Sequence, residues 1–347
     1  FPDTAGQSAW LNFSDKAIWN GLFFMFGGKA YAIFALLFGF SFFIQDDNQR
    51  LRGNDFRLRF CWRLILLFLI GNINASFFTA EVLVLYSLVG FILPLTCRLK
   101  DKWIFALACL LLIQPLPLYY VIRACLDPEF VTPAIPTRSF WNATFAVQSN
   151  GNFLETIRVN LWEGLARAWD HGRVFQTAAL FLLGMLIGRK ELFLKEHLKV
   201  WNKVLAGSLV AFFPLYGLGN MLPDFITNKS ILTPLSLIIT SLSNFAFMLI
   251  LVSGVVFAFY KTNLHDGLMK ITPYGKMSLT NYITQSIVGS MLYYNWGFAL
   301  HNQFGITASC LAGIVFFILQ FSFCRWWMNH HSHGPMEYIW KRATWLK

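Results

Sequence analysis

Charged residues are scarce in this chain. Asp, Glu, Lys and Arg make up only 13% of its 347 residues, whereas about a quarter is usual in soluble domains. Acids are the scarcer sign, since 17 Asp and Glu face 28 Lys and Arg. So little charge cannot cover a water-soluble fold of this length. The hydrophobic content of 56% and the mean hydropathy of +0.52 instead indicate a polytopic membrane protein.

Cysteine is also scarce, and its spacing excludes two classes of protein. No two of the six cysteines form a CxxC pair, so the sequence predicts neither a disulfide framework nor a zinc site. His330, His331 and His333 lie in a polar tail without a fixed helical spacing, which favours a solvated tail over a metal site. The net charge of +11 reflects the placement of loops around a membrane, so we expect no nucleic-acid partner.

Apolar segments follow one another along the whole chain, and no internal repeat divides them. We therefore predict an all-α transmembrane helical bundle, treated as a single domain over residues 1–347. The chain begins at Phe1 without Met, so a further helix upstream would raise the count from nine spans to ten. The nine predicted spans cover residues 19–44, 64–73, 77–95, 103–122, 174–187, 201–222, 232–260, 278–300 and 306–327.

Alternate loops differ in their positive charge. Of the 28 Lys and Arg, 20 lie in one set of loops, at residues 45–63, 97–103, 189–203, 261–276 and 325–347. The positive-inside rule places this set in the cytoplasm, together with the tail at residues 328–347. The visible amino terminus is then outside and the carboxyl terminus inside. The sequence thus predicts that residues 123–173 form an outer loop.

The outer loop contains an amphipathic segment. Residues 152–170 carry an apolar face opposite a charged one, and Asn152 with Glu155 fits a capping box. We expect a helix lying on the membrane surface. Its basic residues, with His171 and Arg173 just beyond it, can either meet an anionic substrate or anchor the helix at lipid phosphates.

Residues 278–300 combine the length of a span with a polar stripe. Ser278, Asn281, Tyr282, Gln285 and Gly289 recur at helical spacing and share one face. An unpartnered amide in hydrocarbon costs several kcal/mol, so this face must point into the bundle. Two interpretations remain open, namely contacts between helices and contacts with a ligand.

Two further candidates lie next to breaks in apolar segments. Lys29 follows Gly27 and Gly28 at a predicted break, and it either contacts a substrate or reaches towards the headgroups. Glu81 and Asn74 lie in a polar turn between two apolar segments. There Glu81 can act as a general base, because burial raises the pKa of a carboxyl, or it can cap the following helix.

Five blocks of this sequence carry a family resemblance. The most specific blocks are GKMSLTNYITQS from Gly275 and GPMEYIWKR from Gly334. The others are Gly28-Lys29 with Leu36-Leu37-Phe38-Gly39, GNINASFFTAEVLVLYSLVG from Gly71, and Leu182-Leu183-Gly184-Met185 with Gly188-Arg189. Together these blocks resemble the YeiB-like family of bacterial inner-membrane proteins, also known as domain of unknown function 418. More distantly, the chain is similar to the heparan-alpha-glucosaminide N-acetyltransferase group.

The resemblance implies a location in the bacterial inner membrane and a distant likeness to enzymes that transfer an acetyl group from cytosolic acetyl-CoA. This chain departs from the pattern at two positions. Asn74 stands where the YeiB-like pattern shows His, and Lys16 stands where the acetyltransferases carry their catalytic His. Glu81 keeps an acid where Asp is usual. The remaining candidates for a catalytic base are therefore Glu81 and His171.

Two functional hypotheses follow. In the first, the protein is an acyltransferase that uses acyl-CoA as donor and a cell-envelope molecule as acceptor, and Lys29 or amide donors stabilise the oxyanion. In the second, it is a transporter or flippase with a hinge at Gly27 and Gly28. The expected partners are the lipid bilayer and these substrates. We expect catalytic roles for Glu81 and His171, and substrate-binding roles for Lys29, Asn74, Arg173, Asn281, Tyr282 and Gln285.

Overall fold

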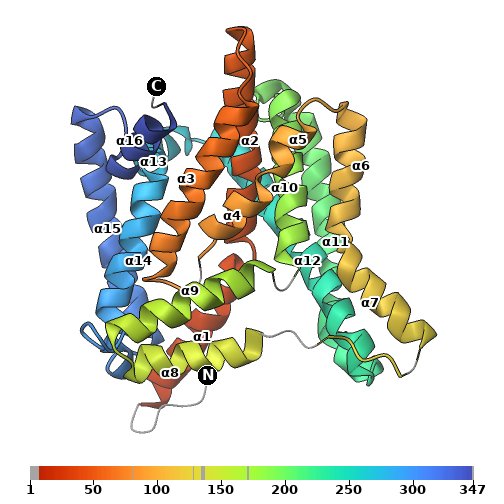
Figure 1. Cartoon of the computed structure of the whole chain (residues 1–347), viewed down its shortest axis with the longest axis vertical. Helices are drawn as coiled ribbons and strands as arrows, with labels where there is room; N and C mark the ends of the chain where they lie inside the picture. Colours follow the sequence, from red (N-terminus) through yellow and green to blue (C-terminus); the bar gives the residue numbers. More distant parts are fainter. Residues whose placement is uncertain (1–7, 80, 128, 134–136, 170–171, 346–347) are drawn as a thin grey trace.

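The computed structural model describes residues 8–79, 81–127, 129–133, 137–169 and 172–345, and every regular element within these ranges is a helix (Figure 1). The predicted all-α class is therefore confirmed. The α-helices are α1 Ala9–Phe26, α2 Ala30–Leu51, α3 Arg57–Ala75, α4 Leu83–Val89, α5 Ile92–Thr96, α6 Asp101–Leu112, α7 Pro115–Leu126, α8 Thr137–Asn150, α9 Phe153–Trp169, α10 Arg173–Arg189, α11 Leu198–Phe225, α12 Lys229–Lys261, α13 His265–Lys276, α14 Ser278–Tyr293, α15 Ile306–His330 and α16 Pro335–Thr344. Two short 3-10 turns, Lys195–His197 and Leu300–Asn302, complete the chain's regular structure within these ranges.

Several of these helices are long and apolar enough to cross a membrane. Among the described residues there are five such segments, or six if α6 and α7, bent by 50° at their junction, form one span. Three predicted spans are not among these segments: residues 77–95 form the short helices α4 and α5, α10 has 17 residues, and α14 has 16. The protein is thus a helical membrane protein, whereas the count of nine spans stays a prediction.

Helix α10 forms the centre of the bundle and packs along α2. Small residues let the two backbones touch: a Cβ added to Gly39 would collide with the carbonyl oxygen of Phe181, and one added to Gly184 would collide with that of Leu36. Gly188 faces the ring of Phe43 in the same way. The spacing of Gly184 and Gly188 therefore serves close helix packing.

Helix α1 connects two parts of the bundle. Near its start, Asp15 accepts a hydrogen bond of 2.7 Å from the backbone N–H of Thr307 at the beginning of α15. Near its end, the ring of Phe24 packs against Phe247 of α12 and Tyr216 of α11, with centroids 5.1 and 5.8 Å apart. Within the described part of the chain, α1 thus bridges the α13–α15 group and the α11–α12 pair.

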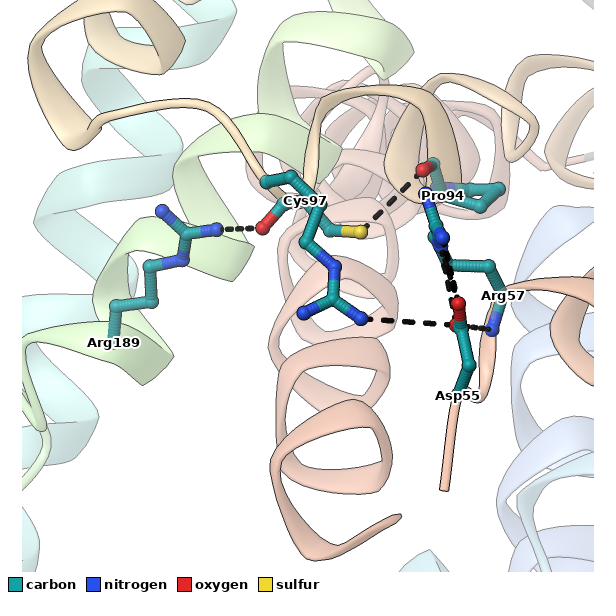
Figure 2. Close-up of polar contacts among 6 residues, drawn as sticks. Asp55, Arg57, Pro94, Cys97 and Arg189 are labelled. Atoms are coloured by element: carbon teal, nitrogen blue, oxygen red, sulfur yellow. Dashed lines mark hydrogen bonds and ion pairs between the residues drawn. The ribbon is translucent and has the colours of Figure 1, made fainter. Parts of the chain in front are cut away.

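One end of the bundle carries the loops rich in Lys and Arg, and we call it the basic end. Figure 2 shows Arg189, at the end of α10, pointing at the carbonyl oxygen of Cys97, while Asp55 lies beside Arg57. Arg189 also contacts Asp101 at 2.9 Å. The hydrogen bonds from Arg57 hold the pKa of the Asp55 carboxyl down at about 2. Ion pairs therefore tie the loops together at this end.

Helix α16 also lies at the basic end, where it joins the two most specific sequence blocks (Figure 1). Glu337 accepts hydrogen bonds from the backbone N–H of Thr280 at 3.0 Å and from its hydroxyl at 2.6 Å, so it caps the start of α14. Arg59 stacks over the ring of Trp345, and Arg63 stacks over Trp340. The tail of the chain is thus fastened to both α14 and α3.

Helices α8 and α9 lie across the opposite end, which we call the far end (Figure 1). The helix expected over residues 152–170 is α9. Its capping box is confirmed as well, since the backbone N–H of Asn152 donates to Glu155 at 3.1 Å and that of Glu155 donates to Asn152 at 3.0 Å.

Candidate functional site

Glu81 lies in the turn between α3 and α4 with 8% of its surface exposed. Asn74, in the last turn of α3, donates a hydrogen bond from its side-chain amide to one carboxylate oxygen. The other oxygen accepts from the backbone N–H of Leu83 and lies 3.4 Å from the hydroxyl of Tyr282 on α14. The fold therefore brings three of the predicted site residues together, and we call Glu81, Asn74 and Tyr282 the carboxylate site.

The carboxylate site has the electrostatics of a proton acceptor that operates near neutral pH. Burial raises the pKa of the Glu81 carboxyl to about 7, against the lowering effect of its hydrogen bonds from Asn74, the Leu83 amide and Tyr282. Glu81 also caps α4 through Leu83, so the capping interpretation holds at the same time. A raised pKa at a buried carboxyl is typical of a functional group.

One acceptor in the carboxylate site has no protein donor. The side-chain carbonyl oxygen of Asn74 is buried and makes no hydrogen bond to the residues that the structure describes. A buried polar atom without a partner costs free energy, typically about 1–3 kcal/mol. A substrate hydroxyl or amine that donates to this oxygen would remove that cost while lying beside Glu81.

A second group of polar side chains joins the carboxylate site to the helices of the far end. The hydroxyl of Thr79 donates to the side-chain oxygen of Asn160 on α9 at 2.6 Å. Gln148 on α8 donates to Thr79 at 3.1 Å and to the hydroxyl of Tyr294 at 2.9 Å. Helices α8 and α9 are thereby fixed over the turn that holds Glu81.

The polar stripe on α14 divides between two environments. Tyr282 reaches the carboxylate site, whereas Asn281 and Gln285 bind neighbouring helices. Asn281 donates to the carbonyl of Tyr274 at 3.0 Å, and Gln285 donates at 2.9 Å both to the Tyr274 hydroxyl and to Gln320 on α15. Contacts between helices account for these amides as they lie, and their role in ligand binding stays a prediction.

Lys29 and Arg173 line a cavity of about 940 Å³ that is bounded by α1, α2, α10, α11 and α12. Both lie near the starts of their helices, because Lys29 directly precedes α2 and Arg173 begins α10. The guanidinium of Arg173 lies over the ring of Tyr31, 5.4 Å from its centroid. The predicted break at Gly27 and Gly28 is present between α1 and α2, and both glycines line the cavity. We call this space the cationic cavity.

A buried network that the sequence did not reveal borders the cationic cavity. Gln176 on α10 accepts from the hydroxyl of Tyr31 and donates to the carbonyl of Ser241 at 3.0 Å. Gln114 donates to the hydroxyl of Ser241 at 2.9 Å from the bend between α6 and α7, with a left-handed φ of 61°. The sequence does contain one indication of this network, because the polar residue Gln114 directly precedes Pro115 within an apolar segment.

The structure links the cationic cavity to the carboxylate site through α4. The hydroxyl of Tyr86 donates to the backbone carbonyl of Tyr31 in the cavity wall. Tyr86 lies on α4, and the first residue of this helix, Leu83, donates its backbone N–H to Glu81. His171, the other predicted base, lies outside the described residues.

These features define a polytopic helical membrane protein with a buried carboxylate and a cationic cavity. Residues 187–347 match the family model described as "Protein of unknown function (DUF418)". This region contains the sequence blocks that begin at Gly275 and Gly334, whereas Glu81 and Lys29 precede it. The match to this model and the similarity to the relatives below support the YeiB-like DUF418 assignment that the sequence blocks predict.

Two bacterial relatives are similar over most of the chain, and a third is similar over a shorter part. The "Uncharacterized protein YxaH" of Bacillus subtilis is 24% identical over 349 residues, covering 96% of this chain and 83% of the relative. The "Uncharacterized 39.9 kDa protein in amylase 3'region" of Bacillus acidopullulyticus is 23% identical over 96% of this chain and 85% of its own. The "Uncharacterized protein YeiB" of Escherichia coli is 29% identical over 75 residues, 20% of this chain and 18% of the relative. No solved structure matches.

Proposed function

We propose that the protein is a transmembrane acyltransferase of the bacterial inner membrane, moving an acyl group from cytosolic acyl-CoA to an acceptor on the outer side. The observation that carries this proposal is the carboxylate site. There a buried Glu81 with a pKa of about 7 lies beside an amide oxygen that lacks a donor among the described residues. The distant likeness to acetyltransferases favours the same chemistry.

The proposed reaction uses Glu81 as a general base and then as a general acid. Glu81 takes the proton from the acceptor's hydroxyl or amine, whose oxygen or nitrogen attacks the thioester carbonyl. The hydroxyl of Tyr282 and the amide of Asn74 are the nearby donors that can stabilise the oxyanion. The C–S bond then breaks, and the departing CoA thiolate takes the proton held by Glu81.

The distribution of charge supports an orientation for this reaction. The described loops at the basic end belong to the set that holds 20 of the 28 Lys and Arg of the sequence, so the positive-inside rule favours the cytoplasm for this end. In Figure 1, α8 and α9 lie at the far end, on the opposite side from α16. In this orientation the visible amino terminus is outside, the carboxyl terminus is inside, and the acceptor approaches Glu81 from the far end.

The test is release of CoA by the purified protein in nanodiscs, with labelled acetyl-CoA and a pool of cell-envelope acceptors. We expect acceptor-dependent release that falls by a factor of about 100 or more in Glu81→Gln, because general-base catalysis typically contributes that much. Glu196→Gln is the matched control, since Glu196 is exposed and lies near the basic end. No release by the folded protein, or equal loss in both variants, would overturn the proposal.

The pH profile supplies an independent check on Glu81. A general base works when deprotonated, so release should rise as pH increases through about 7, the pKa of Glu81, and then reach a plateau. Glu81→Asp should retain this rising limb with a shifted midpoint. A rate of release that stays constant over about two pH units on each side of this pKa would contradict a role for Glu81 as base.

A transporter or flippase is the second candidate function, and the break at Gly27 and Gly28 favours it. Gly28 has a left-handed φ of 75°, and the break borders the cationic cavity. A hinge at this position would let α1 move relative to α2. Uptake of a labelled solute into proteoliposomes, without release of CoA from acyl-CoA, would select this function over acyl transfer.

A further inference from the structure

The cationic cavity differs from the carboxylate site in its charge. Lys29 and Arg173 line it, and no Asp or Glu is among the described residues that form its wall. The other polar lining groups are amides and hydroxyls, including Asn20, Asn220, Thr240 and Asn244. A wall with two cations, neutral donors and no acid favours an anion.

We propose that the cationic cavity binds the phosphate group of an organic molecule, held between Lys29 and Arg173. This inference goes beyond the proposed acyl transfer and holds whether or not that reaction takes place. The shared chemistry is a phosphate attached to a group larger than itself. Its source is either a lipid headgroup or a water-soluble organic phosphate, and the two are separated by the test below.

Lys29 supplies the strongest argument for a bound anion. Only 8% of its surface is exposed, yet its ammonium makes no ion pair within the described part of the chain. The rings of Phe24 and Phe247 lie 5.6 and 5.4 Å from the ammonium nitrogen, which offsets part of the cost of burial. A phosphate oxygen beside the ammonium would offset the remainder.

The neighbouring groups are arranged to receive the same anion. Tyr31 and Gln176 are hydrogen-bonded to each other, and this bond fixes the ring over which Arg173 lies. Helix α2 starts at Lys29 without a side-chain cap, so the positive end of its dipole is not satisfied by a side chain there. Tyr31, Gln176 and the two cations, Lys29 and Arg173, all line the cationic cavity.

Asn244 on α12 depends on Gly28 for its position. A Cβ on Gly28 would collide with the side-chain amide of Asn244. That amide makes no hydrogen bond to any described residue, although it lines the cavity. Gly28 therefore leaves room for a donor that the protein itself does not use.

The size and the apolar side of the cationic cavity indicate more than a free ion. Its volume of about 940 Å³ lies near the upper end of the roughly 300–1,000 Å³ range of small-molecule pockets. Phe23, Leu215 and Tyr216 line one side, and the rings of Phe23 and Tyr216 are 63% and 45% exposed. An apolar chain on the ligand would find its contacts there.

Native mass spectrometry of the full chain in a neutral detergent tests the proposal, with phosphatidylglycerol as the probe and diacylglycerol as its phosphate-free counterpart. We expect one retained phosphatidylglycerol and a fall in affinity of about tenfold or more in Lys29→Gln, because a charged hydrogen bond contributes that much. Lys203→Gln removes the same charge from an exposed site on α11 and should leave binding unchanged.

Two further variants keep the test decisive if Lys29→Gln does not fold. Arg173→Gln should also weaken binding, and Asn244→Asp should abolish it because it places a negative charge in the cavity wall. Glycerol 3-phosphate that binds as tightly as phosphatidylglycerol, with the same loss in Asn244→Asp, would support the phosphate site and assign a soluble source. Equal binding of diacylglycerol, or equal loss in Lys203→Gln, would overturn the proposal.

Discussion

Helices α10 and α15 are both apolar, yet they have opposite surroundings. Helix α10 has 17 residues, and twelve of them are buried, from Gln176 to Gly188 with only Leu183 excepted. Helix α15 has 25 residues, of which only Gln320 and Cys324 are buried. The buried helix is the one with Thr, Ala and Gly at its contacts, whereas the exposed helix is lined by large apolar side chains. In a membrane, apolar character places a helix in the bilayer, and small or polar residues decide what it touches.

The largest expected effect comes from a matched pair of glycines. Gly184→Leu on α10 should prevent folding, because even a Cβ at this position collides with the backbone of Leu36. Gly313→Leu on α15 should be tolerated, since no atom lies within 4 Å of a Cβ built there. Expression and size-exclusion profiles of the two variants in detergent provide the measurement. A normal expression level and size-exclusion profile of Gly184→Leu would contradict the close packing of α10 against α2.

A matched pair of leucines should give the next largest effect. Leu182 is fully buried and Leu319 is 62% exposed. Leu182→Ala leaves a cavity and should lower the free energy of unfolding by about 2–5 kcal/mol. Leu319→Ala removes side-chain atoms that face outwards and should change it by less than about 0.5 kcal/mol. Unfolding in mixed micelles, followed by intrinsic fluorescence, measures both, and equal costs would refute the difference between the helices.

The smallest effect should come from the polar contact of α15. Gln320 donates to Thr284 at 2.8 Å and accepts from Gln285 at 2.9 Å. Gln320→Leu should cost about 0.6–1.7 kcal/mol, the range for hydrogen bonds between membrane helices. Ser322→Ala is the control, because its hydroxyl bonds only within α15, to Ile318. A neutral Gln320→Leu would show that this polar contact does not stabilise the position of α15.

Local patterns in the sequence predicted the parts of the fold that depend on neighbours in the chain. The all-α class and the capping box of Asn152 and Glu155 both follow from spacing over a few residues. Each of these depends on helix geometry, which is the same wherever the helix lies. Lengths were harder to predict, because α14 ends at Tyr293 within the predicted span 278–300, and the predicted span 77–95 is divided between α4 and α5.

The candidate site depended on partners that periodicity cannot identify. The stripe on α14 was predicted to point into the bundle, but only Asn281 is buried, whereas Ser278 and Gln285 are exposed. The pattern also could not say that Tyr282 meets Glu81 while Gln285 meets Gln320. Those pairs are 201 and 35 residues apart in the chain. A helical period tells which side chains share a face, and only the three-dimensional packing tells what that face meets.

The contact between Glu81 and Tyr282 also sets an order of events during synthesis. Glu81 leaves the ribosome 201 residues before Tyr282, which amounts to about 10–40 s at typical bacterial and eukaryotic rates of roughly 5–20 residues per second. Throughout that interval the carboxyl has Asn74 available but lacks the tyrosine. Any nascent chain that stalls before α14 therefore contains Glu81 without its completed surroundings, and the site comes into being only when one of the last helices is inserted.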